Sequence, residues 1–400
     1  MSGALKRDEW ETVRLGDVCE VNPSKKFNVT ISDDLNVGFL PMEAVSNEGD
    51  ILRIDTRKYG EVKKGFSGFQ DGDVLIAKIT PCMENGKGAL VSGMPCGIGF
   101  GSTEFHVLRP DTSKCHAKFI FHIMENPLLR QDFARKMTGS AGQRRLPKEV
   151  LQKLEIPLPP LDVQRQIADT LDKVTELIDL RKKQLEKLDE LVKARFVELF
   201  GTPLLNEKGW EVKSTGDVCS VTDGSHFSPV GKEDGYPMLS VRNMRNDGFH
   251  YDDCKLVSQE DYDILVKQGC KPLKNDVLIA KDGSYFYYGF VVKEEIEQAV
   301  LSSIAILRPN LEEINPEYLC RYMLSSEIVD LVGKNYVTGA AIKRVILKGI
   351  KQIPVMLPPM ELQNQFATFV EQIDKSKIII QQSLDTLETL KKSLMQEYFG

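Results

Sequence analysis

The residues of this chain that come nearest to a metal site are Cys115, His116 and His122. Thiolate and imidazole groups are ligands that zinc prefers, and a structural zinc site needs four of them. Two more ligands at a suitable spacing are missing here, and the cysteines form no CxxC pair. We therefore predict no metal site, a structural role for this cluster and reduced, mostly buried thiols. The eight cysteines are Cys19, Cys82, Cys96, Cys115, Cys219, Cys254, Cys270 and Cys320.

Motifs that carry catalysis or nucleotide binding are also missing. The stretch GIGFG (97–101) imitates a nucleotide-binding loop, but it runs into a strand pattern without an opening helix or a distal acidic residue. The chain has no GxxxxGK[ST], HExxH or [ND]PP[YF] motif. The triplet EVK, at 61–63 and 211–213, lacks the upstream Pro-Asp of metal-dependent nucleases. The sequence therefore predicts a protein without a catalytic site or a cofactor of its own.

A repeat of about half the chain is the main feature of the sequence. LPPLDVQRQIA (158–168) returns as LPPMELQNQFA (357–367), with six of eleven residues identical. Other landmarks return in the same order, which indicates a tandem duplication. They are WETVRLGDVCEV (10–21) with WEVKSTGDVCSV (210–221), DVLIAK (73–78 and 276–281), TGSAGQRR (138–145) with TGAAIKRV (338–345), and the closing ELFG (198–201) with EYFG (397–400).

A long helix is predicted after each LPP stretch. From Pro160, which is tolerated in a first helical turn, no Pro or Gly follows until Gly201, a residue suited to a left-handed C-terminal cap. About 40 residues at 1.5 Å each make a helix of about 60 Å. Spacings of three and four select one narrow apolar seam, typical of a coiled coil. Its apolar members are Ile167, Leu171, Val174, Ile178, Leu185, Leu188, Val192 and Leu199.

The second helix carries an equivalent seam. Basic residues interrupt the two seams at different places, Arg181 and Arg195 against Lys377 and Lys391, which favours pairing of the two helices with each other. A solvated single helix or linker would explain the charge runs but not the seams. The apolar members of the second seam are Phe366, Val370, Ile373, Ile380, Leu384, Leu387, Leu394 and Tyr398.

The two globular parts mix short β-rich and helical runs without regular βαβ alternation, which predicts α+β domains. Residues 22–70 and 222–273 share almost nothing although the surrounding framework repeats. The apolar content of 42% and charged content of 28% are typical of a soluble globular protein. The first residues, MSGALKRDEW, have no apolar core of a signal peptide, so we expect a cytoplasmic protein without a membrane span.

Taken together, the repeated LPPL-x-x-Q-x-x-I/F-A boundary, the two long helices, TGSAGQRRL and DVLIAK make the whole chain resemble the specificity (S) subunit of type I restriction-modification enzymes. The resemblance implies two target recognition domains (1–157 and 201–355), each followed by a conserved helix (158–200 and 356–400). It implies an antiparallel coiled coil with pseudo-two-fold symmetry between the helices, and a bipartite double-stranded DNA target. It further implies two methyltransferase (M) subunits and restriction (R) subunits as partners, which would hold S-adenosylmethionine, ATP and Mg²⁺.

The net charge of −6 is unusual for a DNA-binding protein, because such proteins are normally basic on one face. The resemblance therefore implies that cations cluster locally and that partner subunits neutralise much of the phosphate charge. Arg, Lys, Asn and Gln can hold base edges in the major groove. The candidate DNA contacts are Lys78, Thr80, Asn85, Lys87, Gln143, Arg144 and Arg145 in the first copy, and Arg242, Asn243, Arg245, Lys281, Ser284, Tyr285, Lys343 and Arg344 in the second.

Two other classes of protein stay open from the sequence alone. One is a stand-alone DNA-modifying enzyme with an unrecognised site, which would bind S-adenosylmethionine or Mg²⁺ itself. The other is a coiled-coil scaffold between protein partners, which would show no sequence-dependent DNA binding. The specificity subunit is favoured because it alone accounts for the duplication, the seams and the missing catalytic motifs together.

Overall fold

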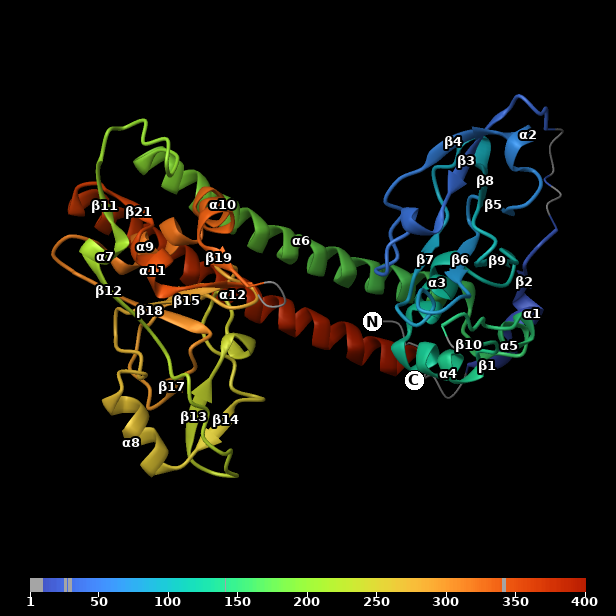
Figure 1. Ribbon diagram of the computed structural model, residues 1–400. Helices are drawn as coiled ribbons and strands as arrows, with labels where there is room; N and C mark the ends of the chain where they lie inside the picture. The colour runs from blue at the N-terminus through green and yellow to red at the C-terminus, as the bar shows by residue number, and fades with distance from the viewer. Residues whose placement is uncertain (1–9, 25–26, 28–30, 141, 340–342) are drawn as a thin grey trace. The chain divides into compact units, whose positions relative to one another are not determined.

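The chain folds into two compact units. The computed structural model describes residues 10–24, 27, 31–140, 142–339 and 343–400 (Figure 1). Unit 1 comprises Met1–Lys182 and Gln382–Gly400, and unit 2 comprises Lys183–Gln381. Each unit therefore holds one α+β domain together with parts of both long helices, α6 (Leu161–Phe200) and α12 (Met360–Phe399). The predicted class, a duplicated α+β domain with a long helix after each copy, is confirmed.

Unit 1 is built on two four-stranded sheets and a two-stranded one within its described residues. The first sheet has the order β2-β9-β6-β7 and is antiparallel throughout. The second has the order β4-β3-β8-β5, in which β3 and β8 run parallel. The strands are β1 (Glu11–Arg14), β2 (Cys19–Val21), β3 (Asn36–Leu40), β4 (Asp55–Lys58), β5 (Ser67–Gln70), β6 (Val74–Ala77), β7 (Gly88–Leu90), β8 (Ile98–Gly101), β9 (Phe105–Pro110) and β10 (Glu155–Leu158).

The two longer of the short helices in unit 1, α3 and α4, follow β9 in the sequence. α3 contacts β6, β7 and β9, and β1 pairs with β10 just before α6 begins. Asn126 caps α4 by accepting from Leu128 N and separates it from α3. The helices are α1 (Leu15–Val18), α2 (Tyr59–Val62), α3 (Ala117–Glu125), α4 (Pro127–Lys136) and α5 (Lys148–Gln152), with short 3₁₀ turns η2 (Met42–Ala44) and η3 (Pro95–Gly97).

Unit 2 repeats this plan with a different second sheet. The sheet β12-β18-β15-β16 matches β2-β9-β6-β7, and a three-stranded sheet β14-β13-β17 replaces the four-stranded one. Its strands are β11 (Glu211–Ser214), β12 (Cys219–Asp223), β13 (Tyr236–Leu239), β14 (Lys255–Val257), β15 (Val277–Ala280), β16 (Gly289–Val291), β17 (Ala299–Val300), β18 (Ile304–Pro309), β19 (Val337–Thr338), β20 (Arg344–Val345) and β21 (Pro354–Leu357). Its helices are α7 (Thr215–Val218), η4 (Val241–Asn243), α8 (Gln259–Lys267), α9 (Pro316–Met323), α10 (Ser326–Asn335) and α11 (Leu347–Lys351).

The repeated DVLIAK segment forms the central strand of each copy because it is buried on both faces. In β6, Val74 and Ile76 enter one core while Leu75 enters another. In β15, Val277 and Ile279 likewise face one core and Leu278 and Ala280 the other. A strand buried on both faces shows an unbroken apolar run instead of alternation. The strand ends carry Lys78 and Lys281 out of these cores toward the loops.

The long helices end as the sequence predicts, but Pro160 lies just before α6. The Pro160 carbonyl accepts from Gln164 N at 2.9 Å, so this proline caps the helix and is not its first helical residue. Gly201 has φ of +80°, the left-handed conformation that a helix stop needs. Every predicted seam position of both helices is buried or half-buried.

The two helices run antiparallel within unit 2. Phe200, at the end of α6, contacts Phe366 near the start of α12, with ring centroids 5.4 Å apart. Farther along, Lys377 of α12 pairs with Asp189 of α6. In unit 1, the start of α6 and the end of α12 share one core, which includes Leu171 and Met395.

A buried glutamine, four residues after the second proline of each LPP stretch, makes the same contacts in both copies. In unit 1, the amide of Gln164 accepts from His116 N at 2.8 Å and donates to the carbonyls of Lys114 and Pro159. In unit 2, Gln363 accepts from Asn315 N at 2.8 Å and donates to the carbonyls of Glu313 and Pro358. Both side chains are fully buried. Each glutamine therefore fastens the first turn of a long helix to the segment before α3 or α9.

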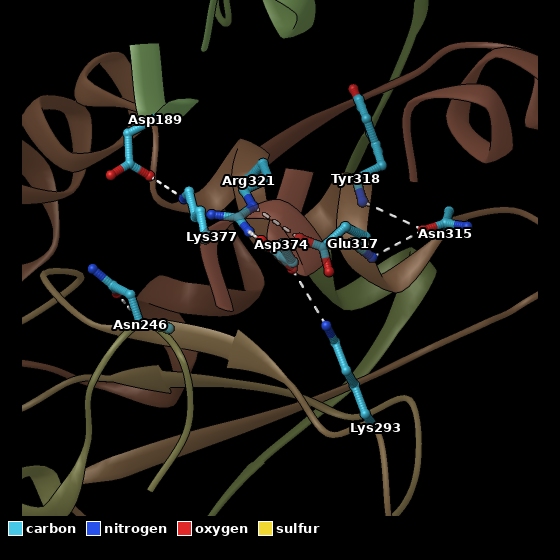
Figure 2. A network of polar contacts seen from close by, with 10 residues as sticks. Asp189, Asn246, Lys293, Asn315, Glu317, Tyr318, Arg321, Asp374 and Lys377 are labelled. Carbon is cyan, nitrogen blue, oxygen red and sulfur yellow. Dashed lines mark hydrogen bonds and ion pairs between the residues drawn. The ribbon is translucent and has the colours of Figure 1, made fainter. Parts of the chain in front are cut away.

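Beside this shared contact, the two copies differ in charge. In unit 1, His122 of α3 lies 2.8 Å from both Glu125 and Asp172, and only 2% of its side chain is exposed. The equivalent residue in unit 2 is Arg321 of α9. It donates to Glu317 at 2.8 Å and lies 3.8 Å from Asp374 of α12 (Figure 2). A titratable imidazole and a permanent cation thus occupy the same place.

Candidate nucleic-acid interface

In unit 1, the loop after β6 and the Gly-rich segment that follows α4 lie side by side. Leu146 N donates to Lys78 O at 2.8 Å, and Thr80 N donates to Arg144 O at 3.0 Å. Arg145 also forms an isolated bridge with Ile79. The framework therefore brings most of the first set of candidates to one surface.

Unit 2 uses the same backbone pairing at the equivalent positions. Val345 N donates to Lys281 O at 2.9 Å, and Gly283 N donates to Lys343 O at 2.7 Å. The η4 turn joins them through Ser303, whose Oγ accepts from Val241 N and whose carbonyl accepts from Lys281 N. All candidates of the second copy consequently belong to three adjoining loops.

The two arginines of unit 1 are paired with carboxylates. Arg145 donates from Nε and Nη2 to both oxygens of Glu104, at 3.0 and 2.8 Å. Arg144 donates from Nη2 to Glu84 at 2.6 Å. The hydrogen bond from Arg145 holds the pKa of Glu104 below its usual range, so the pair stays charged near neutrality. The positive charge of this loop is therefore largely compensated within the unit.

The other candidates of unit 1 differ in how far they reach the surface. Lys87 donates to the Met42 carbonyl at 3.1 Å and is half-buried. Thr80 Oγ1 lies 3.9 Å from the Met137 sulfur. Lys78 is half-buried, whereas Asn85 and Gln143 are exposed. Asn85 and Gln143 are thus the uncharged side chains of this group that solvent reaches most freely.

Unit 2 leaves its cations more open. Lys343 and Arg344 are exposed, and Ser303 takes the place of Glu104 of unit 1. Among the described residues, neither cation makes an ion pair with a carboxylate. Lys281, by contrast, is enclosed: its side chain is 7% exposed and lies 3.3 Å from Asp223 and 3.6 Å from Asp282.

The η4 turn presents two more exposed cations. Arg242 is exposed, and Arg245 lies over the Tyr288 ring at 5.7 Å while it donates to the Arg242 and Met244 carbonyls. Asn243 uses its side-chain oxygen to accept from Ser240 N at 3.0 Å, which leaves its NH₂ group as a donor. Ser284 is exposed and Tyr285 is half-buried. Unit 2 therefore places an exposed arginine over an aromatic ring of the loop between β15 and β16.

The sequence cluster Cys115, His116 and His122 does not converge on one point. His122 is held by two carboxylates, and His116 Nδ1 is buried without a hydrogen-bond partner. In the part of the chain that the structure describes, no group of three His, Cys, Asp or Glu side chains could hold a metal ion. All eight cysteines are free, and Cys96 is the exposed one among them.

Comparison with known proteins places the chain in a family. The model of the type I restriction modification DNA specificity domain matches residues 7–190 and again residues 207–389. The chain belongs to this family. Its two matched regions correspond to the two copies of the repeat, so each copy is a specificity domain.

Curated relatives of the chain are specificity subunits. The EcoEI type I restriction enzyme specificity subunit of Escherichia coli is 38% identical over 182 residues, which is 45% of this chain and 30% of that protein. The MjaVIII subunit of Methanocaldococcus jannaschii is 24% identical over 434 residues, covering 99% of this chain and 93% of that protein. The chain matches less than a third of the length of the EcoEI and EcoAI subunits, 30% and 31% respectively.

Solved structures share the fold. The type I restriction-modification system S subunit from M. genitalium superposes with a TM-score of 0.59 at 14% identity, over 98% of this chain and 96% of that one. A chain from a study of complex assembly and conformational transition of a type I R-M system gives a TM-score of 0.56 at 20% identity, over 97% of each chain. No described helix is long and apolar enough to cross a membrane.

Three residues of these specificity domains were missed from the sequence. Glu84 and Glu104 pair with the candidate arginines of the first domain. Tyr287, in the second, is 67% exposed. The available signal was the aromatic run SYFYYGF after the second DVLIAK, where the first copy has TPCMENGKG. The run indicated an unusual loop but did not tell which ring is exposed.

Proposed function

We propose that this chain is the DNA-recognition subunit of a type I restriction-modification system and reads a bipartite double-stranded target. One observation carries the proposal: a shared backbone framework presents different side chains at equivalent loops twice. In the first specificity domain these loops carry Arg144 and Arg145 paired with glutamates, and in the second they carry exposed Lys343 and Arg344. Two loop sets with different hydrogen-bonding groups suit two different half-sites.

The domain division follows from the same proposal. Residues 1–157 would read one half-site and residues 201–355 the other. The helical segments 158–200 and 356–400 would act as a coiled-coil spacer on which two methyltransferase subunits dock. Restriction subunits would join this complex, which would act in the cytoplasm.

The chain would not be an enzyme in this assembly. Methyl transfer from S-adenosylmethionine, and ATP- and Mg²⁺-dependent cleavage, would belong to the partner subunits. Because the chain has a net charge of −6, the partners would also supply much of the phosphate neutralisation. Binding of the isolated chain to DNA is therefore expected to be weak.

Co-expression with a methyltransferase subunit from the same host tests the proposal. The complex is expected to methylate a split motif, which long-read sequencing of the expression host's DNA detects. Replacing residues 1–157 with those of another family member should change one half of the motif and leave the other half unaltered. A complex that forms but methylates no bipartite site would contradict the proposal, and so would a chain that does not co-purify with a methyltransferase.

The exposed cations supply a second readout. Each phosphate contact that is lost lowers the dependence of the logarithm of the binding constant on the logarithm of salt concentration by about 0.9. Lys343→Ala and Arg344→Ala in the complex should each flatten this slope by about that amount. Lys267→Ala on α8, an exposed lysine outside the loops and the helical segments, is the matched control.

A further inference from the structure

Tyr287 lies in the loop between β15 and β16, which differs in length and in side chains from the loop between β6 and β7 of the first domain. In the first domain, Met83 is buried and its N–H donates to Ile79 O at 3.0 Å; in the second, Phe286 is buried and its N–H donates to Ala280 O at 2.7 Å. The acceptors of these two bonds are not equivalent, because the loop of the second domain is two residues shorter: Ala77 N donates to Lys87 O in the first domain, and Ala280 N donates to Tyr288 O in the second. The buried side chain is followed by Glu84 in the first domain and by Tyr287 in the second.

The structure holds the Tyr287 ring outward. Tyr287 N donates to Ser284 O at 3.1 Å, which closes a turn just before the ring. The ring is 67% exposed and meets Tyr288 edge to face, with centroids 4.7 Å apart. An isolated exposed aromatic residue is common on protein surfaces and by itself indicates nothing. Its surroundings are what distinguish this one.

Cations lie on the segments that adjoin this loop. Arg245 lies over the adjacent Tyr288 ring, and Asn246 Oδ1 accepts from Gly289 N at 3.2 Å, which ties the η4 segment to the end of the same loop. At the start of the loop, Gly283 N donates to the carbonyl of the exposed Lys343. An exposed aromatic ring in a loop that adjoins basic segments fits a polyanion whose bases offer flat apolar surfaces.

We propose that Tyr287 contacts a base of the second half-site through its ring and helps to determine which sequence is read there. The ring has no charge, so it neutralises no phosphate and releases no counterion. An apolar contact in a groove instead discriminates among bases, for example through the thymine methyl group. Glu84, in the corresponding loop of the first domain, accepts hydrogen bonds and is already paired with Arg144. The two half-sites are consequently read with different chemistry at this point.

The inference rests on the proposed function, and the experiment separates the two. The complex with methyltransferase subunits is prepared with the wild-type chain, Tyr287→Ala, Tyr287→Phe and Leu205→Ala. Leu205 is 71% exposed and lies between α6 and β11, outside the three loops, so its variant is a matched control. Anisotropy of a fluorescent duplex carrying the wild-type motif gives affinity over a range of salt concentrations. Sequencing of methylated host DNA gives the motif.

Tyr287→Ala is expected to lose about tenfold in affinity, within the range for one base contact, without a change in the salt slope. One position of the second half-site should become degenerate while the first half-site stays unchanged. Tyr287→Phe and Leu205→Ala should behave as the wild type. The idea is overturned by an unchanged motif, or by a loss of affinity that comes with a flatter salt slope.

A structural role for the ring has its own signature. If Tyr287→Ala lowers the thermal midpoint of the complex as much as it lowers affinity, the ring supports the fold and the inference fails. If the wild-type complex methylates no bipartite site, it is the proposed function that fails, before any variant is compared.

Discussion

The contacts between each specificity domain and its long helix can be compared residue by residue. Gln164 and Gln363 make the same three hydrogen bonds to backbone groups in both units. Farther along the same long helices, His122 faces Asp172 in unit 1 and Arg321 lies near Asp374 in unit 2. The two units share the hydrogen bonds to the backbone and differ in their charged side chains.

The difference teaches which part of the contact depends on neighbouring side chains. A glutamine bonded to carbonyls and an N–H depends on the backbone path alone, which both copies share. An ion pair depends on two or more side chains at once, so it changes as a group. Lys118 accompanies His122 and pairs with Asp172 at 2.6 Å, whereas at the equivalent place Arg321 has Glu317. The first contact is consequently titratable and the second is not.

The largest expected effect comes from removing the buried glutamine that both units share. Gln164→Ala and Gln363→Ala each leave one N–H and two carbonyls without partners, which costs about 2–4 kcal/mol in the free energy of unfolding. The loss should be similar in the two units. Hydrogen exchange resolved by peptide measures it separately in α3 and α9.

Exposed glutamines on the same helices provide the controls for this test. Gln166→Ala and Gln365→Ala should change protection by no more than about 0.5 kcal/mol. Loss of protection in one unit only would show that the equivalence of the two anchors is wrong.

The next largest effect concerns the charged residues His122 and Arg321, in which the two units differ. His122→Ala leaves Glu125 and Asp172 without their buried partner, and we expect it to cost about 3 kcal/mol in unit 1. Arg321→Ala should cost less, about 1–2 kcal/mol, because the Arg321 side chain is 25% exposed and water can replace part of its contacts. Peptide-resolved hydrogen exchange again separates the two. Equal losses in α3 and α9 would contradict this ranking.

The pH dependence of stability should differ between the units. Burial lowers the pKa of His122, but the hydrogen bonds that it donates to Asp172 and Glu125 outweigh this effect, so the pKa is raised above its usual 6.5. His122 donates to Asp172 and lowers the pKa of that carboxyl to about 2. Because the pKa of His122 is higher in the folded state, its interactions stabilise unit 1 fully below pH 6.5, and this stabilisation is lost as the pH rises through the folded-state pKa. Because the pKa of Asp172 is lower in the folded state, its interactions stabilise unit 1 above pH 3.8, and this stabilisation is lost as the pH falls toward 2.

The stabilisation in unit 1 should therefore be complete between about pH 4 and 6.5 and decline at higher pH. Unit 2 should show no such decline up to pH 9, because Arg321 keeps its proton. Hydrogen exchange at pH 6 and pH 8.5, corrected for the intrinsic rate, checks this in α3 and α9. The variant Arg321→His should transfer the same pH dependence to unit 2, and its failure to do so would remove histidine as the cause.

The smallest effect concerns the loops and depends on DNA binding. Glu104→Gln removes the carboxylate that compensates Arg145, so nonspecific duplex binding by the methyltransferase complex should strengthen a few-fold. The salt slope should steepen by up to about 0.9. Glu48→Gln, an exposed glutamate of the same domain, is the control. An unchanged slope would show that Arg145 is not near phosphate and that the contrast with Lys343 has no electrostatic consequence.

Much of the fold was predictable from the sequence for physical reasons that act locally or repeat. Gly201 stops α6 because a left-handed residue ends a helix, and the 3–4 spacing of residues such as Leu171 and Val192 marks the face that becomes buried. The duplication itself needed only a comparison of the chain with itself. The candidate residues could also be assigned to loops, because each lies just after a strand or between repeated landmarks of the framework.

The surface of these loops was decided by tertiary structure. Glu104 reaches Arg145 across 41 positions, His122 reaches Asp172 across 50, and Lys281 is enclosed by Asp223. Side chains so far apart in sequence meet only through the path of the strands and loops between them, and no periodic pattern records such a meeting. The sequence by itself therefore determined two like domains and two long helices. Only the folded chain decided which cations stay open and that Tyr287 faces outward.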